Sequence, residues 1–324
     1  MGNLIRWGII GCGQVTEVKS GPAYKQVEGF EIIAVMRRNL SLAKNYAERH
    51  QIESFYNNAD ELIENEKVDA VYIATPPDTH EYYALKVAEA GKICCIEKPM
   101  APGYKACRSI KNAFDQKGLP LFVAYYRRSL PRFEKIKAVL DDQTIGELRH
   151  ISWRFSKPAS EIDASKDYNW RTDSKIAHGG YFDDLASHGL DLFIHLLGDI
   201  VEVSGISINQ QHLYSARDAV SASWLHQTAV TGSGYWNFGA FEKRDSVEII
   251  GSQGKISFSV FEEKPVEVIT NEAYDTFFID NPKHIQFYHV ANMKKALEGG
   301  MVHPSTGTTA THTSWVMDKI LGKI

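Results

Sequence analysis

Over its first 125 residues the chain alternates between short apolar runs and stretches of helical periodicity. Runs typical of buried strands lie at residues 4–10, 30–36, 68–74, 92–96 and 119–124. Helix-length stretches lie between them, at about 14–27, 42–50, 79–90 and 104–117. Continuous apolar strands separated by helices are typical of a parallel sheet covered on both faces. We therefore predict a doubly wound α/β domain over residues 1–125, with ligands at the carboxyl ends of its strands.

The pattern changes after Pro131, where strands follow one another with little helix between them. A helix is expected to about Leu140, and then strands at 147–156, 201–208, 219–231, 233–240, 246–251, 255–260 and 265–269. This pattern predicts an α+β domain with an open, mostly antiparallel sheet over residues 126–324. Helical periodicity returns at 283–297 and again near the C-terminus, where a helix over 308–322 could pack back on the first domain.

Composition excludes several classes of protein. A length of 324 residues suits two domains, and a net charge of −4 gives no general attraction to nucleic acid or to anionic membranes. No apolar run approaches the roughly 20 residues that span a bilayer, and the N-terminus lacks the pattern of a signal peptide. We expect a cytoplasmic protein. The cysteines at 12, 94, 95 and 107 fit no zinc or redox motif, so reduced, partly buried thiols are expected.

A glycine loop follows the first strand. In GIIGCGQVT, Gly11 would make the tight turn, and Gly13 would let the backbone approach a pyrophosphate. Thr16 occupies the place of the third glycine of the dinucleotide fingerprint. A plain glycine turn is the alternative, but the order strand, loop, helix favours a dinucleotide. The expected cofactor contacts in this loop are Gly11, Cys12, Gly13, Gln14 and Val15.

The end of the second strand bears on which dinucleotide is used. An acidic residue there would hold the ribose 2′-hydroxyl of NAD, but the strand runs into Arg37 and Arg38. Two guanidiniums suit a 2′-phosphate. The sequence therefore favours NADP(H), with NAD(H) and a solvated basic turn as the alternative.

Two loops are expected beside the cofactor because they follow strands of the parallel sheet. The first begins Thr75-Pro76 and leads to His80, and the second is Glu97-Lys98-Pro99. Lys98 thus stands at a carboxyl strand end, on the ligand side. A strand end followed by an ordinary turn is the alternative interpretation.

The stretch GGYFDDLASHGLDLFIHLLGD, residues 179–199, carries a second constellation. Asp184 and His188 are four residues apart, so they share one face of a helix, and the carboxylate could orient the imidazole. A merely packed histidine is the alternative. A metal site built from Asp184, His188 and His195 lacks any supporting local pattern, and no metal is expected.

Together these residues resemble the glucose–fructose oxidoreductase / inositol dehydrogenase (Gfo/Idh/MocA) family of NAD(P)-dependent oxidoreductases. The matching segments are GIIGCG, IATPPDTH, EKP, the G-G-x-x-x-D-x-x-x-H pattern of residues 179–188, and R-x-x-P from Arg128 to Pro131. The resemblance implies a Rossmann domain and an open-sheet domain, a Lys98–Pro99 peptide that can be cis, and dimers or tetramers. Ala186 departs from a glycine that is common in the family.

The resemblance also implies hydride transfer between NADP(H) and a hydroxyl or carbonyl carbon of a sugar or cyclic polyol. Lys98, His188 and Asp184 are the expected catalytic residues: His188 as general acid/base, Lys98 on the reacting oxygen, and Asp184 holding His188 or a substrate hydroxyl. Lys98 and His188 could exchange roles. Cofactor contacts are further expected from Arg37, Arg38, Thr75, Pro76, His80, Glu97 and Lys98, and substrate contacts from Tyr126, Arg128, Trp170 and Arg171. The alternatives are a non-catalytic sensor of this fold and an enzyme acting on a non-sugar substrate.

Overall fold

The computed structural model describes residues 4–165 and 167–324, and the chain forms two compact units. The first unit comprises Met1–Ser129 and Pro282–Thr311, and the second comprises Leu130–Asn281 and His312–Ile324. Pro282–Thr311 thus belongs with the first unit, although the sequence division placed it in the second domain. Residues 1–3, part of the N-terminus where no signal peptide is expected, lie outside the described residues.

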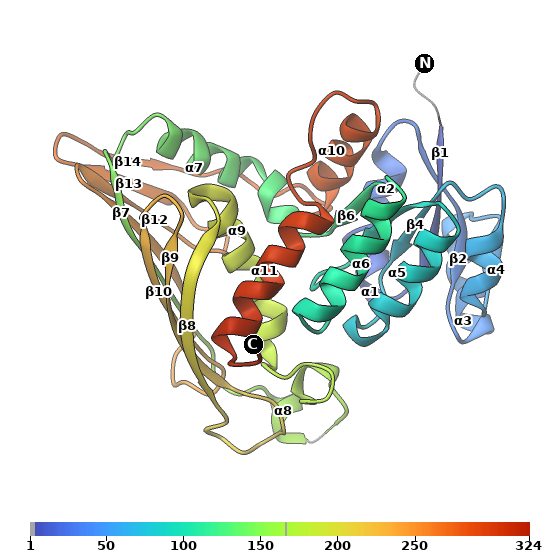
Figure 1. The fold of residues 1–324 in the computed structure, drawn as a ribbon, viewed down its shortest axis with the longest axis horizontal. Coiled ribbons are helices and arrows are strands. Elements are labelled where there is room, and N and C mark those ends of the chain that lie inside the picture. The colour runs from blue at the N-terminus through green and yellow to red at the C-terminus, as the bar shows by residue number, and fades with distance from the viewer. Residues whose placement is uncertain (1–3, 166) are drawn as a thin grey trace. The chain divides into compact units, whose positions relative to one another are not determined.

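The first unit contains the predicted doubly wound fold (Figure 1). Its six-stranded parallel sheet has the order β3-β2-β1-β4-β5-β6. The strands are β1 (Ile5–Ile10), β2 (Phe30–Met36), β3 (Ser54–Tyr56), β4 (Ala70–Ile73), β5 (Ile93–Ile96) and β6 (Leu121–Val123). The sequence analysis missed β3, because three half-buried residues at the edge of a sheet carry too short a pattern.

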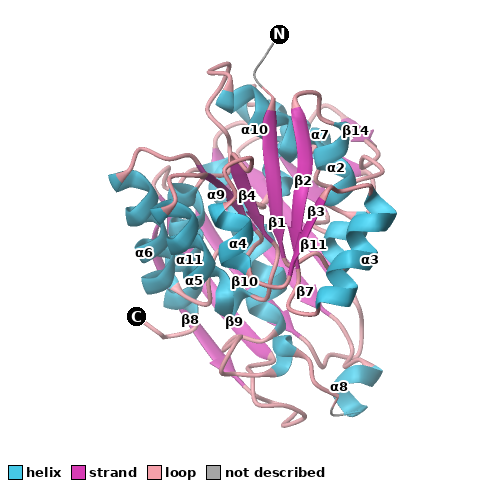
Figure 2. Ribbon diagram, turned by 90° about the vertical axis from the view of Figure 1, so that its right-hand side faces the viewer, coloured by secondary structure: helices cyan, strands magenta, loops and turns pink. Residues whose placement is uncertain are grey.

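Helices cover both faces of this sheet (Figure 2). They are α1 (Gln14–Val18), α2 (Gly21–Gln26), α3 (Leu40–His50), α4 (Ala59–Glu64), α5 (His80–Glu89), α6 (Tyr104–Gln116) and α10 (Phe287–Leu297). Residues of α4, α5 and α6 pack in the core on one face, and those of α2, α3 and α10 in the core on the other. The single helix expected over 14–27 is wrong: it breaks before Gly21-Pro22, because proline cannot continue the preceding helix.

Buried polar contacts fix the Pro282–Thr311 segment to the sheet of the first unit. The hydroxyl of Ser305 donates to the carbonyl oxygen of Val123 in β6 at 2.7 Å. The imidazole Nε2 of His303 lies 3.1 Å from the carbonyl oxygen of His289, and the two rings are 4.7 Å apart at right angles. Burial lowers the pKa of His303 to about 4 and also holds the pKa of His289 well below its usual value. Both rings are therefore neutral in the folded protein.

This histidine pair predicts a loss of stability in acid. Because the pKa of His303 is depressed on folding, the unfolded chain takes up a proton first, and the free energy of unfolding falls as the pH drops from about 6.5 towards 4. His303 alone accounts for roughly 3 kcal/mol over that interval. Urea unfolding at a series of pH values measures this slope. The slope should be shallower in a His303→Gln variant, and an unchanged slope would contradict the assignment.

The second unit is built on an eight-stranded sheet of order β14-β13-β12-β11-β7-β10-β9-β8, in which only β7 and β10 pair in parallel. The predicted open, mostly antiparallel sheet is confirmed. The strands are β7 (Leu148–Ser156), β8 (Ile200–Ile208), β9 (Ala219–His226), β10 (Thr231–Asn237), β11 (Arg244–Gly251), β12 (Gly254–Phe258), β13 (Val266–Thr270) and β14 (Tyr274–Phe277). The expected strand over 219–231 is wrong, because Ala229 adopts a left-handed turn conformation (φ 63°) between β9 and β10.

Helices α7 (Pro131–Asp141), α8 (Glu161–Ser165) and α9 (Ser187–Leu197) also belong to this unit, and α11 (Gly307–Ile320) begins in the first unit and ends in the second. Helix α9 lies directly on the sheet, because Gly189 leaves room for the ring of buried Trp153 in β7. The rings of Phe193 and Trp236 pack edge-on against the same indole. None of the described helices has the length and hydropathy needed to cross a membrane.

Candidate functional site

The glycine loop connects β1 to α1. The backbone N–H of Gly11 donates to the carbonyl oxygen of Met36 at 2.9 Å, and its φ of 95° suits only glycine. A Cβ on Gly11 would lie 2.9 Å from the backbone of Ala74. At Gly13, by contrast, a Cβ would meet nothing nearer than 3.9 Å. The loop therefore leaves open space at Gly13, where Gln14 and Val15 begin α1.

Thr16 replaces the third glycine without disturbing the loop. Its buried hydroxyl donates to the carbonyl oxygen of Gly13 at 2.8 Å, and its own carbonyl accepts from Tyr46 at 3.0 Å. The close helix approach occurs instead at Gly21, where a Cβ would lie 2.2 Å from the carbonyl oxygen of Thr16. Cys12 is buried, and burial raises the pKa of its thiol to about 11. Only its backbone can serve a ligand.

Arg37 and Arg38 are exposed directly after β2. The Nη1 atom of Arg37 lies 3.4 Å from the carbonyl oxygen of Cys12, so this guanidinium borders the glycine loop. Asn39 then caps α3 by accepting from the N–H of Leu42 at 3.1 Å. The position that an acid would occupy in an NAD site thus carries a cation.

The loops after β4 and β5 are held together by His80, which is fully buried. Its Nε2 lies 2.8 Å from the carbonyl oxygen of Thr75, and its Nδ1 lies 3.1 Å from that of Pro99. Pro76 follows Thr75 in the first loop, and the Lys98–Pro99 peptide in the second is cis, as the resemblance implied. Burial lowers the pKa of His80. The ring thus links the two loops.

The carboxylate of Glu97 points into the protein. It accepts from the hydroxyl of Tyr72 and, at 2.6 Å, from the side-chain amide of Gln286. These contacts fix the backbone from which Lys98 extends. Gln286 could not be predicted from the sequence, because 189 residues separate it from Glu97.

Tyr126 and Arg128 are both buried in the short 3₁₀ helix Tyr126–Ser129. The guanidinium of Arg128 donates to the carbonyl oxygen of Pro304 at 3.1 Å, and Arg127 lies over the ring of Tyr126 at 5.0 Å. Arg128 therefore helps to anchor the Pro282–Thr311 segment in the first unit.

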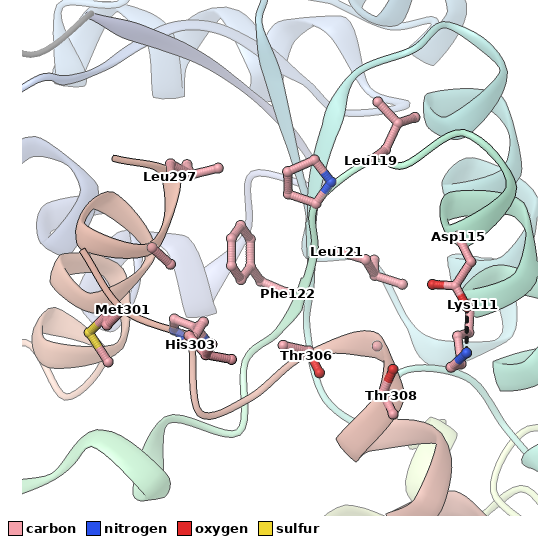
Figure 3. A pocket seen from close by; sticks show the side chains of 14 residues that line it. Lys111, Asp115, Leu119, Leu121, Phe122, Leu297, Met301, His303, Thr306 and Thr308 are labelled. Carbon is pink, nitrogen blue, oxygen red and sulfur yellow. Dashed lines mark hydrogen bonds and ion pairs between the residues drawn. The ribbon is translucent and has the colours of Figure 1, made fainter. Parts of the chain in front are cut away.

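A cavity of about 440 Å³ also lies in the first unit, between α6, the start of β6 and residues 296–308 (Figure 3). The Lys111–Asp115 ion pair borders it, and Leu121, Phe122 and Met301 line it. It lies at the amino-terminal end of β6, away from the carboxyl strand ends, so we do not assign it to the cofactor.

In the second unit, Asp184 lies in a π-helical turn, Phe182–Ala186, which leads into α9 and His188. Such turns often occur at functional sites. Because of this turn, the four-residue spacing between Asp184 and His188 does not have the geometry of a regular α-helix. Both side chains are buried, and the ring of His188 packs edge-on against Phe261, with centroids 5.7 Å apart.

Three residues that the sequence singled out in this unit come together. The Nε atom of Arg171 donates to the Oδ2 atom of Asp184 at 2.6 Å, and its guanidinium lies over the ring of Trp170 at 4.4 Å. Further along α9, the carboxylate of Asp191 accepts from the hydroxyl of Thr313 in α11 at 2.9 Å. Across residues 4–165 and 167–324, no cluster of three His, Cys, Asp or Glu side chains is arranged to hold a metal ion.

The sequence analysis overlooked Asp183, although it stands beside Asp184. Its Oδ2 atom accepts from the N–H of Gly179 at 2.9 Å, and burial raises its pKa to about 6. The sequence analysis also overlooked Tyr181 and Asp163, which are joined by a 2.6 Å hydrogen bond. Tyr181 directly follows the two glycines, a signal that could have indicated it, but nothing in the local sequence indicates Asp163.

Comparisons with known proteins cover both units. The sequence model of an oxidoreductase family with an NAD-binding Rossmann fold matches residues 5–125, and that of the GFO/IDH/MocA C-terminal domain matches residues 133–257. Oxidoreductase P35 of Formosa agariphila is 38% identical over 88% of each chain. Trans-1,2-dihydrobenzene-1,2-diol dehydrogenase of Sus scrofa is 27% identical over 71% of this chain and 67% of its own. The solved structure of a levoglucosan dehydrogenase with NADH superposes with a TM-score of 0.87 at 21% identity, over 98% of this chain and 95% of its own.

Proposed function

We propose a specific activity for this chain, which belongs to the GFO/IDH/MocA family of NAD-binding oxidoreductases. The proposed activity is reversible hydride transfer between NADP(H) and a hydroxyl or carbonyl carbon of a sugar or cyclic polyol. The observation that carries it is the order β1-β4-β5 in the sheet. The glycine loop, the Thr75 loop and Lys98 each follow one of these three adjacent strands. Because neighbouring parallel strands end at the same edge of a sheet, all three lie at the edge where ligands bind.

The first unit supports the cofactor part of this proposal. The space at Gly13 fits the approach of a pyrophosphate, and Arg37 beside the loop fits a 2′-phosphate. The nicotinamide supplies the hydride acceptor or donor when it is bound. Tyr72, His80 and Gln286 would act by positioning, since they hold the two loops from which Thr75 and Lys98 extend.

In this proposal Lys98 and His188 act on the same substrate oxygen. His188 exchanges the proton of the hydroxyl, and Lys98 stabilises the negative charge that develops on the oxygen. The Asp184–Arg171 pair would orient the substrate, with Trp170 offering a flat face to a sugar ring. The levoglucosan dehydrogenase neighbour, which is a sugar enzyme by its name, supports this substrate class.

The test is a turnover screen of the purified protein with NADP⁺ and NAD⁺ against neutral sugars, sugar acids, cyclic polyols and a trans-dihydrodiol, following formation of reduced cofactor. Turnover of a sugar or polyol supports the proposal. Turnover of the dihydrodiol alone would contradict a sugar or polyol substrate and favour the dihydrodiols that appear in the names of several relatives. Bound cofactor without any turnover would favour a sensor. Cytoplasmic location and assembly into dimers or tetramers stay predictions.

A further inference from the structure

A cluster of side chains surrounds Tyr181 in the second unit, beside the Asp184–Arg171 pair. The hydroxyl of Tyr181 donates to Asp163 at 2.6 Å and accepts from the amide of Asn169 at 3.0 Å. The Oδ1 atom of Asn169 also caps the turn Trp170–Thr172, by accepting from the N–H of Arg171 at 3.2 Å. Tyr181 therefore connects α8 to the turn that carries Trp170 and Arg171.

Lys157 extends over this cluster from the end of β7. Its Nζ atom lies 3.6 Å from the centroid of the Tyr181 ring and 5.8 Å from that of Phe238. Within the part of the chain that the structure describes, its Nζ atom makes these two ring contacts but no hydrogen bond and no ion pair. The side chain is half-buried, and burial lowers its pKa.

The neighbouring carboxylates of Asp163 and Asp184 attract this ammonium but do not pair with it, because each is bonded to other groups. Asp163 accepts from Tyr181 and twice from Ser160, from its backbone N–H at 2.9 Å and its hydroxyl at 2.7 Å. Asp184 pairs with Arg171. Lys157 thus differs from Arg171, because the aromatic faces beside it offset only part of the cost of removing an ammonium from water.

An ammonium that has no hydrogen-bond acceptor is stabilised best by an anionic one, because charge-assisted hydrogen bonds are the strongest that it can make. We propose that Lys157 binds a carboxylate of the substrate, so that the sugar or polyol used by this enzyme is an acidic one, of the uronic or aldonic acid class. This inference rests on the proposed function, since it names the substrate of the same site. Lys157 would then determine specificity without taking part in hydride transfer.

The experiment measures the binding of matched pairs to the cofactor-loaded protein by calorimetry: glucuronate against glucose, and galacturonate against galactose. Wild type should bind at least one acid about 10- to 150-fold more tightly than its neutral counterpart, the range expected of one charge-assisted hydrogen bond. Lys157→Met, which keeps the packing on Tyr181 but removes the charge, should reduce that preference to within about threefold. Lys137→Met, which removes an exposed lysine paired with Asp141, is the matched control and should retain the preference.

Equal or tighter binding of the neutral sugars would overturn the inference, as would an acid preference that survives in Lys157→Met. The same holds if no acid binds at all. Because binding is read without turnover, failure here is distinguishable from failure of the proposed function, which the turnover screen tests separately.

Discussion

Replacing Lys98 with Met, or His188 with Asn, should each lower kcat by about 10²–10⁴-fold, the range typical of a lost proton-transfer or charge-stabilising group. The dissociation constant for NADPH should change far less, because Lys98 is only one of the expected cofactor contacts and both variants keep the glycine loop and Arg37. The measurements are steady-state kinetics on the substrate found in the screen and a fluorescence titration of each variant with NADPH.

Matched controls separate this effect from general damage. Lys117→Met removes a surface lysine that binds the carbonyl oxygen of Glu89, and His212→Asn removes an exposed histidine. Both controls should turn over normally. Because the His188 side chain is buried, its replacement could disturb folding. Circular dichroism of His188→Asn therefore checks that the fold is intact. Near-normal turnover in both site variants would remove Lys98 and His188 from the proposed mechanism.

Substitution by alanine should have different effects at Gly11 and Gly13, two glycines of the loop that look equivalent in the sequence. Gly11→Ala should lower the free energy of unfolding by about 2 to 6 kcal/mol, since it combines a strained backbone angle with a clash. The angle is a φ of 95°, and the clash is with the backbone of Ala74, 2.9 Å away. Gly13→Ala should leave stability nearly unchanged, because its φ is −125° and its surroundings are open. It should nevertheless weaken cofactor binding, because the new methyl fills the space proposed for the pyrophosphate.

Denaturant unfolding without cofactor, followed by titration with NADPH, separates these effects. Each variant serves as the control for the other, since both exchange one glycine for alanine in the same loop. If Gly13→Ala bound NADPH as tightly as wild type, the pyrophosphate could not lie where we propose. If Gly11→Ala were as stable as wild type, the strain argument would be wrong.

The sequence predicted the elements whose apolar pattern is long. Strand β2 occupies Phe30–Met36 as predicted, because seven consecutive residues carry the signal of a strand buried in a parallel sheet. The turn between β9 and β10 was missed because it contains neither glycine nor proline, the residues that usually mark a turn in the sequence. Ala229 nevertheless adopts a left-handed conformation there, in a hairpin closed by backbone hydrogen bonds between His226 and both Ala229 and Val230.

The candidate site shows the same division. Lys98, Asp184 and His188 could be proposed from the sequence because they lie in compact motifs whose residues are neighbours in the sequence. Gln286, Lys157 and Asp163 gain their interest from partners far along the chain, such as Glu97 for Gln286 and Tyr181 for Lys157. No local periodicity records such contacts, so only the folded chain brings them into view.

The most direct test of the account is a titration of the purified protein with NADPH and with NADH, following cofactor fluorescence. We predict that NADPH binds about 10- to 150-fold more tightly, from one charge-assisted contact to the 2′-phosphate, and that the double variant Arg37→Ser, Arg38→Ser loses this preference. Equal affinity, or a preference for NADH, would reduce the two arginines to a surface turn. Failure to bind either dinucleotide would contradict the central claim that this chain transfers hydride.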